Sequence, residues 1–320
     1  MNASTEATGT PILSVVIPLC NEEGNVALLL ERLHDALEPL EVPYEVILVD
    51  DGSRDATWSI VSEAADKDDR LKGLSLSRNF GHESAMFAGL YHSSGEAVVT
   101  MDGDLQHPPS LVPELFKAWQ EGNKVVETQR LENEDASIIR RTTSRGFYRL
   151  FSFLSGLPMV QGTSDFHLVD RQVVDNILQM KDAELFLRGI THWVGFRKTT
   201  IPYRAVSRHT GETKYNLLTM IRLAASSLFS FSMVPLQLGI WMGLITSGLA
   251  FLELIYILVT YFRGNAIPGW ASTLTVISFM FGILFILIGI IGAYLGRVLE
   301  TLKNRPRFIV QDQLGFRDLP

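Results

Sequence analysis

The residues best suited to chemistry in this sequence include Asp102 and Asp104, two positions apart, with Gln106 two positions further on. In an extended segment, side chains at this spacing point to the same side. Neighbouring carboxylates repel each other unless a cation joins them, and carboxylate and amide oxygens are ligands that Mg²⁺ and Mn²⁺ prefer. The cluster therefore predicts Mg²⁺ or Mn²⁺ held jointly by the protein and a substrate diphosphate.

Two further polar clusters each follow an apolar run, and they read Pro18-Leu19-Cys20-Asn21-Glu22-Glu23 and Asp50-Asp51-Gly52-Ser53. Taken alone, either cluster could be a helix cap or a turn, because Asp, Asn and Ser favour both. Three such clusters at the ends of predicted strands are harder to explain in that way. Open α/β sheets bind ligands beyond the carboxyl ends of their strands, so the clusters together predict a binding site.

The elements that must position these clusters alternate along the first part of the chain. Short β-branched runs predict strands, and apolar residues at helical spacing predict helices between them. This alternation indicates an α/β fold with a mostly parallel, doubly wound sheet and helices on both faces. The predicted strands are 12–19, 44–49, 71–76, 97–101 and 124–129, and the predicted helices are 26–37, 56–65, 82–91 and 111–121.

Several function classes are excluded or disfavoured. The chain has 28 Lys and Arg against 35 Asp and Glu, and a net charge of −7 argues against a nucleic-acid binder. Neither the glycine pattern of a dinucleotide-binding turn nor that of a P-loop is present. The single cysteine, Cys20, rules out a disulfide within the chain and a cysteine-based zinc site, and the seven histidines show no zinc-type spacing.

The mean hydropathy of +0.17 has a local cause. Residues 234–297 carry only three charges, and they contain two apolar segments, 236–262 and 271–296. Each would reach about 40 Å as a helix, which is enough to cross a membrane. Basic residues flank both outer ends, so both are predicted to lie in the cytoplasm. Two Gly-x-x-x-Gly spacings, Gly239/Gly243 and Gly292/Gly296, predict close helix packing within one chain or in a homo-oligomer.

Six motifs in order resemble those of family 2 glycosyltransferases with the GT-A fold, specifically the polyprenyl-phosphate sugar transferases. They are VVIPLCNEEGN, VDDGSRDAT, SRNFGHESAMFAGL, MDGDLQHPP, TSDFHLVDR and RHTGETKYN, and the resemblance runs from about Leu13 to Val310. The bactoprenol glucosyltransferases with two C-terminal membrane spans look most similar, and the dolichol-phosphate mannose synthases look related. The Gln-x-x-Arg-Trp signature of processive synthases is absent, which favours transfer of a single sugar.

The resemblance implies a role for each matching residue. It implies nucleotide-sugar binding by Pro18, Asn21, Glu22, Asp50, Asp51, Asp102, Gly103 and Arg130. It implies a metal site at Asp102, Asp104 and Gln106, with Asp104 contributing to catalysis, and it makes Asp165 the candidate base. Acceptor-phosphate binding is implied for Arg140, Ser144, Arg208 and Lys214. Gly103 departs from the alanine that relatives commonly have, and the change is expected to be tolerated because this residue supplies no ligand.

The expected reaction is inverting transfer of one hexose, with glucose as the first expectation, from a UDP-sugar to undecaprenyl phosphate or another polyprenyl phosphate. GDP-mannose or another donor remains an alternative. A second class is a membrane-anchored protein that binds a sugar nucleotide without turnover. The acceptor phosphate is largely anionic at neutral pH, so Asp165 could position groups rather than remove a proton.

The expected organisation has five parts, with the catalytic domain on the cytoplasmic side of the inner membrane. They are a disordered lead-in at 1–11, a GT-A domain at 12–215, interfacial amphipathic helices at 216–235, two transmembrane helices with a short external loop at 236–297, and a cytoplasmic tail at 298–320.

Overall fold

The computed structural model describes residues 11–131, 163–180, 187–204, 234–263, 269–303 and 305–316. The described residues up to 204 and from 305 onward form one compact unit, and residues 234–303 form a second. The predicted lead-in at 1–11, apart from Pro11, and the interfacial segment at 216–235, apart from its last two residues, lie outside the described residues.

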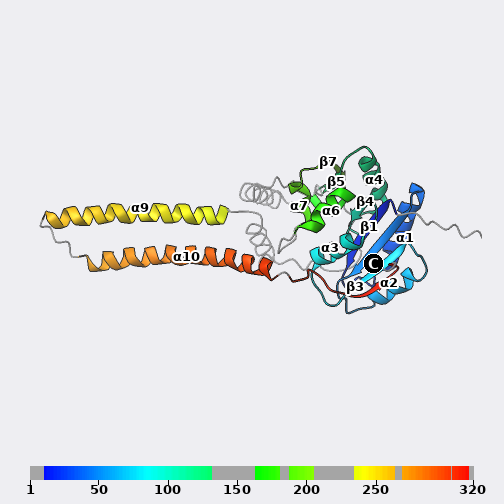
Figure 1. Cartoon of the computed structure of the whole chain (residues 1–320), viewed down its shortest axis with the longest axis horizontal. Coiled ribbons are helices and arrows are strands. Elements are labelled where there is room, and N and C mark those ends of the chain that lie inside the picture. The colour runs from blue at the N-terminus through cyan, green and yellow to red at the C-terminus, as the bar shows by residue number, and fades with distance from the viewer. Residues whose placement is uncertain are drawn as a thin grey trace, which may run out of the picture. The chain divides into compact units, whose positions relative to one another are not determined.

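Strands and helices alternate through the first unit as predicted (Figure 1). The nine elements predicted up to residue 129 are confirmed with their ends within one residue. The strands are β1 Leu13–Leu19, β2 Tyr44–Asp50, β3 Leu71–Leu76, β4 Ala97–Thr100, β5 Val125–Arg130, β6 Thr163–Asp170, β7 Lys198–Tyr203 and β8 Val310–Leu314. The helices are α1 Val26–Leu37, α2 Thr57–Ala65, α3 His82–His92, α4 Val112–Gln120, α6 Arg171–Gln179, α7 Leu187–Trp193, α9 Val234–Phe262 and α10 Trp270–Leu302.

The described strands form one eight-stranded sheet in the order β7-β5-β6-β4-β1-β2-β3-β8. The pairs β1–β2, β1–β4, β2–β3 and β5–β7 are parallel. Two strands run the other way: β6 lies between β4 and β5, and β8 lies at the edge beside β3. The predicted GT-A-like α/β fold with a mostly parallel sheet is confirmed, and the two antiparallel strands are an addition that the alternating pattern did not reveal.

Both faces of the sheet are covered. One face packs against α1, α2 and α4, where Leu29, Val61 and Leu115 are fully buried. The other packs against α3, α6 and α7, through residues such as Met86 and Val173. With helices on both sides, the central strands read as continuous apolar runs, and every residue of β1 is buried.

The last strand returns the chain to this sheet after α10. β8 pairs antiparallel with β3, and Phe308 and Phe316 on either side of it lie against His92 at the end of α3. Arg307 donates to the Met180 carbonyl and lies over the Phe87 ring. Part of the segment predicted as a tail therefore belongs to the sheet.

The second unit contains the two long helices α9 and α10, which run side by side (Figure 1). A Cβ added at Gly239 would stand 2.9 Å from Leu287 Cδ2, so the first Gly-x-x-x-Gly pair packs within the chain. Among the described residues, one helix has a stretch long and apolar enough to cross a membrane, Phe279–Gly296 in α10, while α9 has the shorter apolar stretch Gly239–Leu249. The prediction of two transmembrane helices is therefore not confirmed and stays a prediction.

A buried carboxylate ties together the starting ends of the central strands. Glu45 Oε1 accepts hydrogen bonds from Ser14 Oγ at 2.6 Å and from Ser94 N at 2.7 Å, and Lys72 donates to Oε2. Burial alone would raise the pKa of Glu45, but the hydrogen bonds from Lys72, Ser14 and Ser94 lower it below its ordinary value. A lowered folded-state pKa stabilises the fold above the unfolded pKa of about 4.3, and this contribution is lost as the pH falls through the folded pKa.

We therefore expect Glu45→Gln to lower the melting temperature at pH 7 and to flatten its fall between about pH 5 and pH 3. Thermal unfolding of the purified protein across this pH range measures both effects. Glu63→Gln, on the exposed surface of α2, is the matched control. If the melting temperature of Glu45→Gln fell as steeply with pH as that of the parent, Glu45 would not be a source of the acid sensitivity.

Candidate active site

The candidate site lies at the carboxyl ends of the central strands, where the pairing of β1 with β4 ends earlier than its pairing with β2. The β1–β4 pairing ends at Val16 and Thr100, whereas β1 and β2 stay paired as far as Leu19 and Asp50. Pro18, which has no N–H to donate, lies in the stretch of β1 beyond the β4 pairing. The chain order also reverses here, since β2 and β3 lie on one side of β1 and β4 lies on the other. Such a switch point is where open α/β sheets bind ligands.

The two loops that follow β1 and β2 form one wall of the candidate site by hydrogen-bonding to each other. The Asn21 N–H donates to Ser53 Oγ at 2.9 Å, and Asn21 Oδ1 accepts from the Arg54 N–H at 2.8 Å. The Glu22 N–H donates to Thr57 Oγ1 at 2.9 Å. Asn21 has a φ of +56°, a left-handed conformation that asparagine tolerates better than most residues. The predicted nucleotide-binding residues of the first two clusters are therefore brought together.

Asp50 and Asp51 are both buried but differ in their surroundings. The two Asp51 carboxylate oxygens accept the backbone N–H groups of Phe80 and Gly81, at 2.7 and 3.0 Å. Asp51 thus fixes the loop that leads into α3. Burial raises the pKa of Asp50, and the nearby Asp55 and Asp51 carboxylates act in the same direction against the hydrogen bonds from Ser53. Nucleotide binding by either residue stays a prediction.

The predicted metal cluster follows β4 directly. Asp102 Oδ1 is buried and has no hydrogen-bond partner among the described residues, while Asp104 Oδ1 accepts the Gln106 N–H at 3.1 Å. Leu105, between Asp104 and Gln106, has a φ of +63°, which is a strained conformation for a leucine. Arg130 at the end of β5 lies within hydrogen-bond reach of Gln106, with Nη1 3.4 Å from Oε1. Four predicted site residues thus surround one turn.

Gly103 packs closely against β1. A Cβ there would stand 2.3 Å from Leu19 Cδ2 and 3.4 Å from the Pro18 carbonyl oxygen. An alanine at this position would therefore require the Leu19 side chain to move. The glycine that is present leaves this space to Leu19, so the expected tolerance of glycine needs no such movement.

Asp165, in the antiparallel strand β6, lies near the same cluster of residues. Its carboxylate Oδ2 lies 3.8 Å from His82 Nε2, and that nitrogen lies 3.4 Å from Asp102 Oδ1. The Asp165 carbonyl accepts a hydrogen bond from Thr100 Oγ1 at 2.7 Å, which connects β6 to the end of β4. The structure thus places the candidate base and the candidate metal ligand on either side of one imidazole.

Two histidines were not identified as site residues from the sequence. His82 is the first residue of α3, and His107 follows the metal cluster. The Asp102 N–H donates to His107 Nδ1 at 3.0 Å, and the His107 ring stacks on Phe166 with centroids 5.2 Å apart. Both lie inside quoted motifs, but no spacing rule marks a histidine that works by tertiary contact.

The residues present fit a divalent cation that is shared with a substrate. Among the described residues, no group of three or more His, Cys, Asp or Glu side chains is placed to hold a metal. One or two carboxylates with substrate phosphates and water is nevertheless the usual coordination of Mg²⁺. The buried oxygen of Asp102, which has no hydrogen-bond partner among the described residues, is the observation that favours a cation here.

The other predicted site residues, Arg140, Ser144, Arg208 and Lys214, lie outside the described residues. Cys20 is exposed at the end of β1, where Asn79 Nδ2 lies 3.2 Å from its sulfur. Partial burial of the sulfur atom raises the pKa of the Cys20 thiol, although the residue as a whole is exposed. The nearby Asp51, Asp50 and Asp55 carboxylates raise this pKa further. A raised pKa makes this thiol a poor nucleophile.

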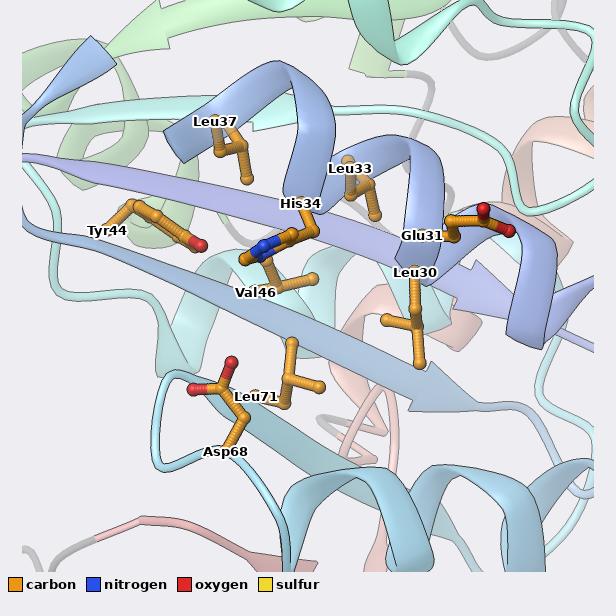
Figure 2. Close-up of a pocket in the computed structure, with 9 residues that line it drawn as sticks. All are labelled: Leu30, Glu31, Leu33, His34, Leu37, Tyr44, Val46, Asp68 and Leu71. Carbon is orange, nitrogen blue, oxygen red and sulfur yellow. The ribbon is translucent and has the colours of Figure 1, made fainter. Parts of the chain in front are cut away.

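A separate pocket lies at the opposite ends of the strands (Figure 2). It lies between α1 and the starting ends of β2 and β3, and its lining includes Leu33, Val46 and Leu71 with His34 and Asp68. None of the predicted site residues lines it, so the cluster at the carboxyl ends of the strands remains the candidate active site.

Comparisons with known proteins show which family the chain belongs to. The model of the family described as "Glycosyl transferase family 2" matches residues 14–178. The chain is 36% identical to the prophage bactoprenol glucosyl transferase homolog of Escherichia coli K12, over 93% of this chain and 98% of that protein. It is 35% identical to the bactoprenol glucosyl transferase of Shigella phage SfV, over 94% and 98%.

The chain is also similar to proteins of less defined activity and to solved structures. An uncharacterized glycosyltransferase of Bacillus subtilis, YkcC, is 36% identical over 95% of both chains. The crystal structure of Mycobacterium tuberculosis glucosyl-3-phosphoglycerate synthase with uridine diphosphate aligns with a TM-score of 0.47 and 23% identity, covering 69% of this chain and 79% of that one. The family match over half of the chain and the relatives over nearly all of it show that this chain is a glycosyltransferase belonging to glycosyl transferase family 2.

Proposed function

We propose that this chain transfers one hexose, glucose by first expectation, from a UDP-sugar to a polyprenyl phosphate such as undecaprenyl phosphate. The observation that supports this most directly is that Asp102, at the end of β4, and Asp165, in β6, lie 3.4 and 3.8 Å from the same nitrogen, His82 Nε2. Relatives named bactoprenol glucosyl transferase, which match over almost the whole chain, support the lipid acceptor and the sugar.

The proposed donor site is the wall formed by the first two clusters and the turn after β4. Asn21 and Glu22 fix this wall through their bonds to Ser53, Arg54 and Thr57, and the buried Asp50 carboxyl lies at its base. The diphosphate would lie at the turn, within reach of Asp102, Asp104 and Arg130. A divalent metal bound there supplies neutralisation of the departing diphosphate.

The acceptor phosphate is an anion that must approach an anionic donor, so its own charge must also be neutralised. We propose that Arg140, Ser144, Arg208 and Lys214 bind the lipid phosphate, where charged groups make strong hydrogen bonds. A phosphate oxygen then forms a bond to the anomeric carbon while the bond from that carbon to the donor's β-phosphate oxygen breaks. The electron pair leaves with UDP, and in-line attack inverts the anomeric centre. We propose that Asp165 lies beside the attacking phosphate, where it either positions the reacting groups or acts as a base.

The test is release of UDP by the purified protein in detergent. The reaction contains undecaprenyl phosphate, Mg²⁺ or Mn²⁺, and UDP- or GDP-sugars supplied one at a time. We expect release that requires lipid, metal and a single donor, with UDP-glucose tried first and GDP-mannose as the principal alternative. Nucleotide binding without release from any donor would instead favour a non-catalytic sugar-nucleotide-binding protein.

We further propose that the chain is a multi-pass protein of the inner membrane with its sheet unit in the cytoplasm. β7 and β8 belong to the same sheet, so the chain between them must cross a membrane an even number of times. If the apolar stretch of α10 is one crossing, a second must lie between residues 204 and 270, and α9 is the long helix described there. The closure of the sheet thus supports two spans, although α9 is the less apolar helix.

The connection between α9 and α10 should then lie outside the cell. In a Cys20→Ser background, we expect Asn265→Cys to react with a membrane-impermeant maleimide in intact cells. Gln311→Cys, in the exposed part of β8, should react only after the cells are lysed. Equal labelling of the two positions in intact cells would contradict this topology.

A further inference from the structure

The first residue of α3, His82, lies between two carboxylates and has no role in the reaction described so far. Its backbone is held in place because the preceding residues, Phe80 and Gly81, both donate to the buried Asp51 carboxylate. Gly81 has a φ of +98°, a conformation that a residue with a side chain rarely adopts. The entry to α3 is therefore fixed, and the imidazole extends from it toward Asp102 and Asp165.

The His82 ring is shared between two groups that belong to different strands. Its Nε2 lies 3.4 Å from Asp102 Oδ1 at the end of β4 and 3.8 Å from Asp165 Oδ2 in β6. Both distances exceed those of a good hydrogen bond, and a single N–H can serve only one carboxylate at a time. The ring therefore stands between two acceptors without being committed to either.

His107, the second histidine beside Asp102, does not donate a hydrogen bond from its Nδ1 to the Asp102 carboxylate. His107 Nδ1 accepts the Asp102 N–H at 3.0 Å, so that nitrogen carries a lone pair and has no proton to donate to the carboxylate. The stacking of its ring on Phe166 holds it in this orientation. Of the two rings near Asp102, His82 is the one that can donate.

We propose that His82 is a positioning residue for Asp165. When the donor and its cation engage Asp102, the His82 N–H is left to hydrogen-bond Asp165 and holds its carboxylate facing the acceptor phosphate. This inference rests on the proposed function. It predicts that His82 acts after the donor has bound, and that it acts through Asp165.

The test compares His82→Ala and His82→Phe, which both lack the donor group, with His82→Gln, which keeps an N–H at similar reach. We expect kcat for UDP release to fall by about 10- to 100-fold in the first two, since misplacing a reacting group by about 1 Å can cost about 10²-fold. The KM for the UDP-sugar should stay within about twofold. His82→Gln should recover most of the rate, and His34→Ala on the exposed face of α1 should match the parent.

The decisive measurement is a double-mutant cycle with Asp165→Ala, which removes both carboxylate oxygens. If His82 works through Asp165, adding His82→Phe to Asp165→Ala should cost less than about twofold, because the interaction is already lost. Additive losses would overturn the proposal, as would an unchanged kcat in His82→Phe or a weakened affinity for UDP. His82→Phe and His82→Gln preserve the bulk of the side chain, so the comparison holds if the alanine variant melts early. Failure of the proposed function would appear differently, as absence of UDP release from the parent protein.

Discussion

Asp104→Asn is expected to lower UDP release by at least about 10²- to 10³-fold, which is the usual cost of removing one electrostatic partner of a developing charge. Asparagine lacks the negative charge that a divalent cation needs, but its side-chain oxygen can still accept the Gln106 N–H as Asp104 Oδ1 does. The turn after β4 should therefore survive while the chemistry does not. The measurement is the initial rate of UDP release over a range of Mg²⁺ and Mn²⁺ concentrations.

Its matched control is Asp69→Asn, the same change at an exposed position in the loop before β3. That variant should keep the parent's rate and metal dependence. Both variants should also melt within a few degrees of the parent. Near-normal, metal-dependent turnover by Asp104→Asn would remove the metal assignment, and an early melt would show that the carboxylate is needed for the turn itself.

Asp51→Ala is expected to lower the melting temperature by an amount on the order of 10 °C and to abolish measurable UDP release. The variant removes the buried carboxylate and leaves the part-buried N–H groups of Phe80 and Gly81 without their acceptor. Each unsatisfied buried group costs about 1–3 kcal/mol, and about 1 kcal/mol corresponds to about 2–4 °C in a domain of this size. Activity should fall because the same loop positions His82 beside Asp102 and Asp165.

Thermal unfolding and UDP binding, measured on the same preparation, separate this structural role from direct nucleotide contact. Asp51→Asn keeps one acceptor oxygen and should lose roughly half as much stability. Asp55→Asn, whose carboxylate bonds to Thr57 in a part-buried position, shows what a neighbouring acidic residue of the same wall contributes. An unchanged melting temperature with lost UDP binding would assign Asp51 to the nucleotide instead.

The sequence alone determined the alternating elements up to residue 129, because their signals are local. Each buried strand is a short apolar run, and each helix shows apolar residues at helical spacing, so packing and propensity agree along the chain. The positions of the polar clusters followed from the same patterns. Since the carboxyl ends of parallel strands meet at one edge, the approach of Asn21 to Ser53 could be expected before any coordinates.

The tertiary structure decided what depends on contacts between distant segments. β8 is short, and three of its five residues are exposed, so nothing local marks it as a strand; its pairing with β3 across more than two hundred residues creates it. β6 runs antiparallel between β4 and β5, and that insertion brings Asp165 toward Asp102. The placement of His82 between these carboxylates depends on Asp51 fixing the entry to α3. Spacing along a chain cannot reveal such a meeting, because it is set by where segments far apart in the sequence lie in space.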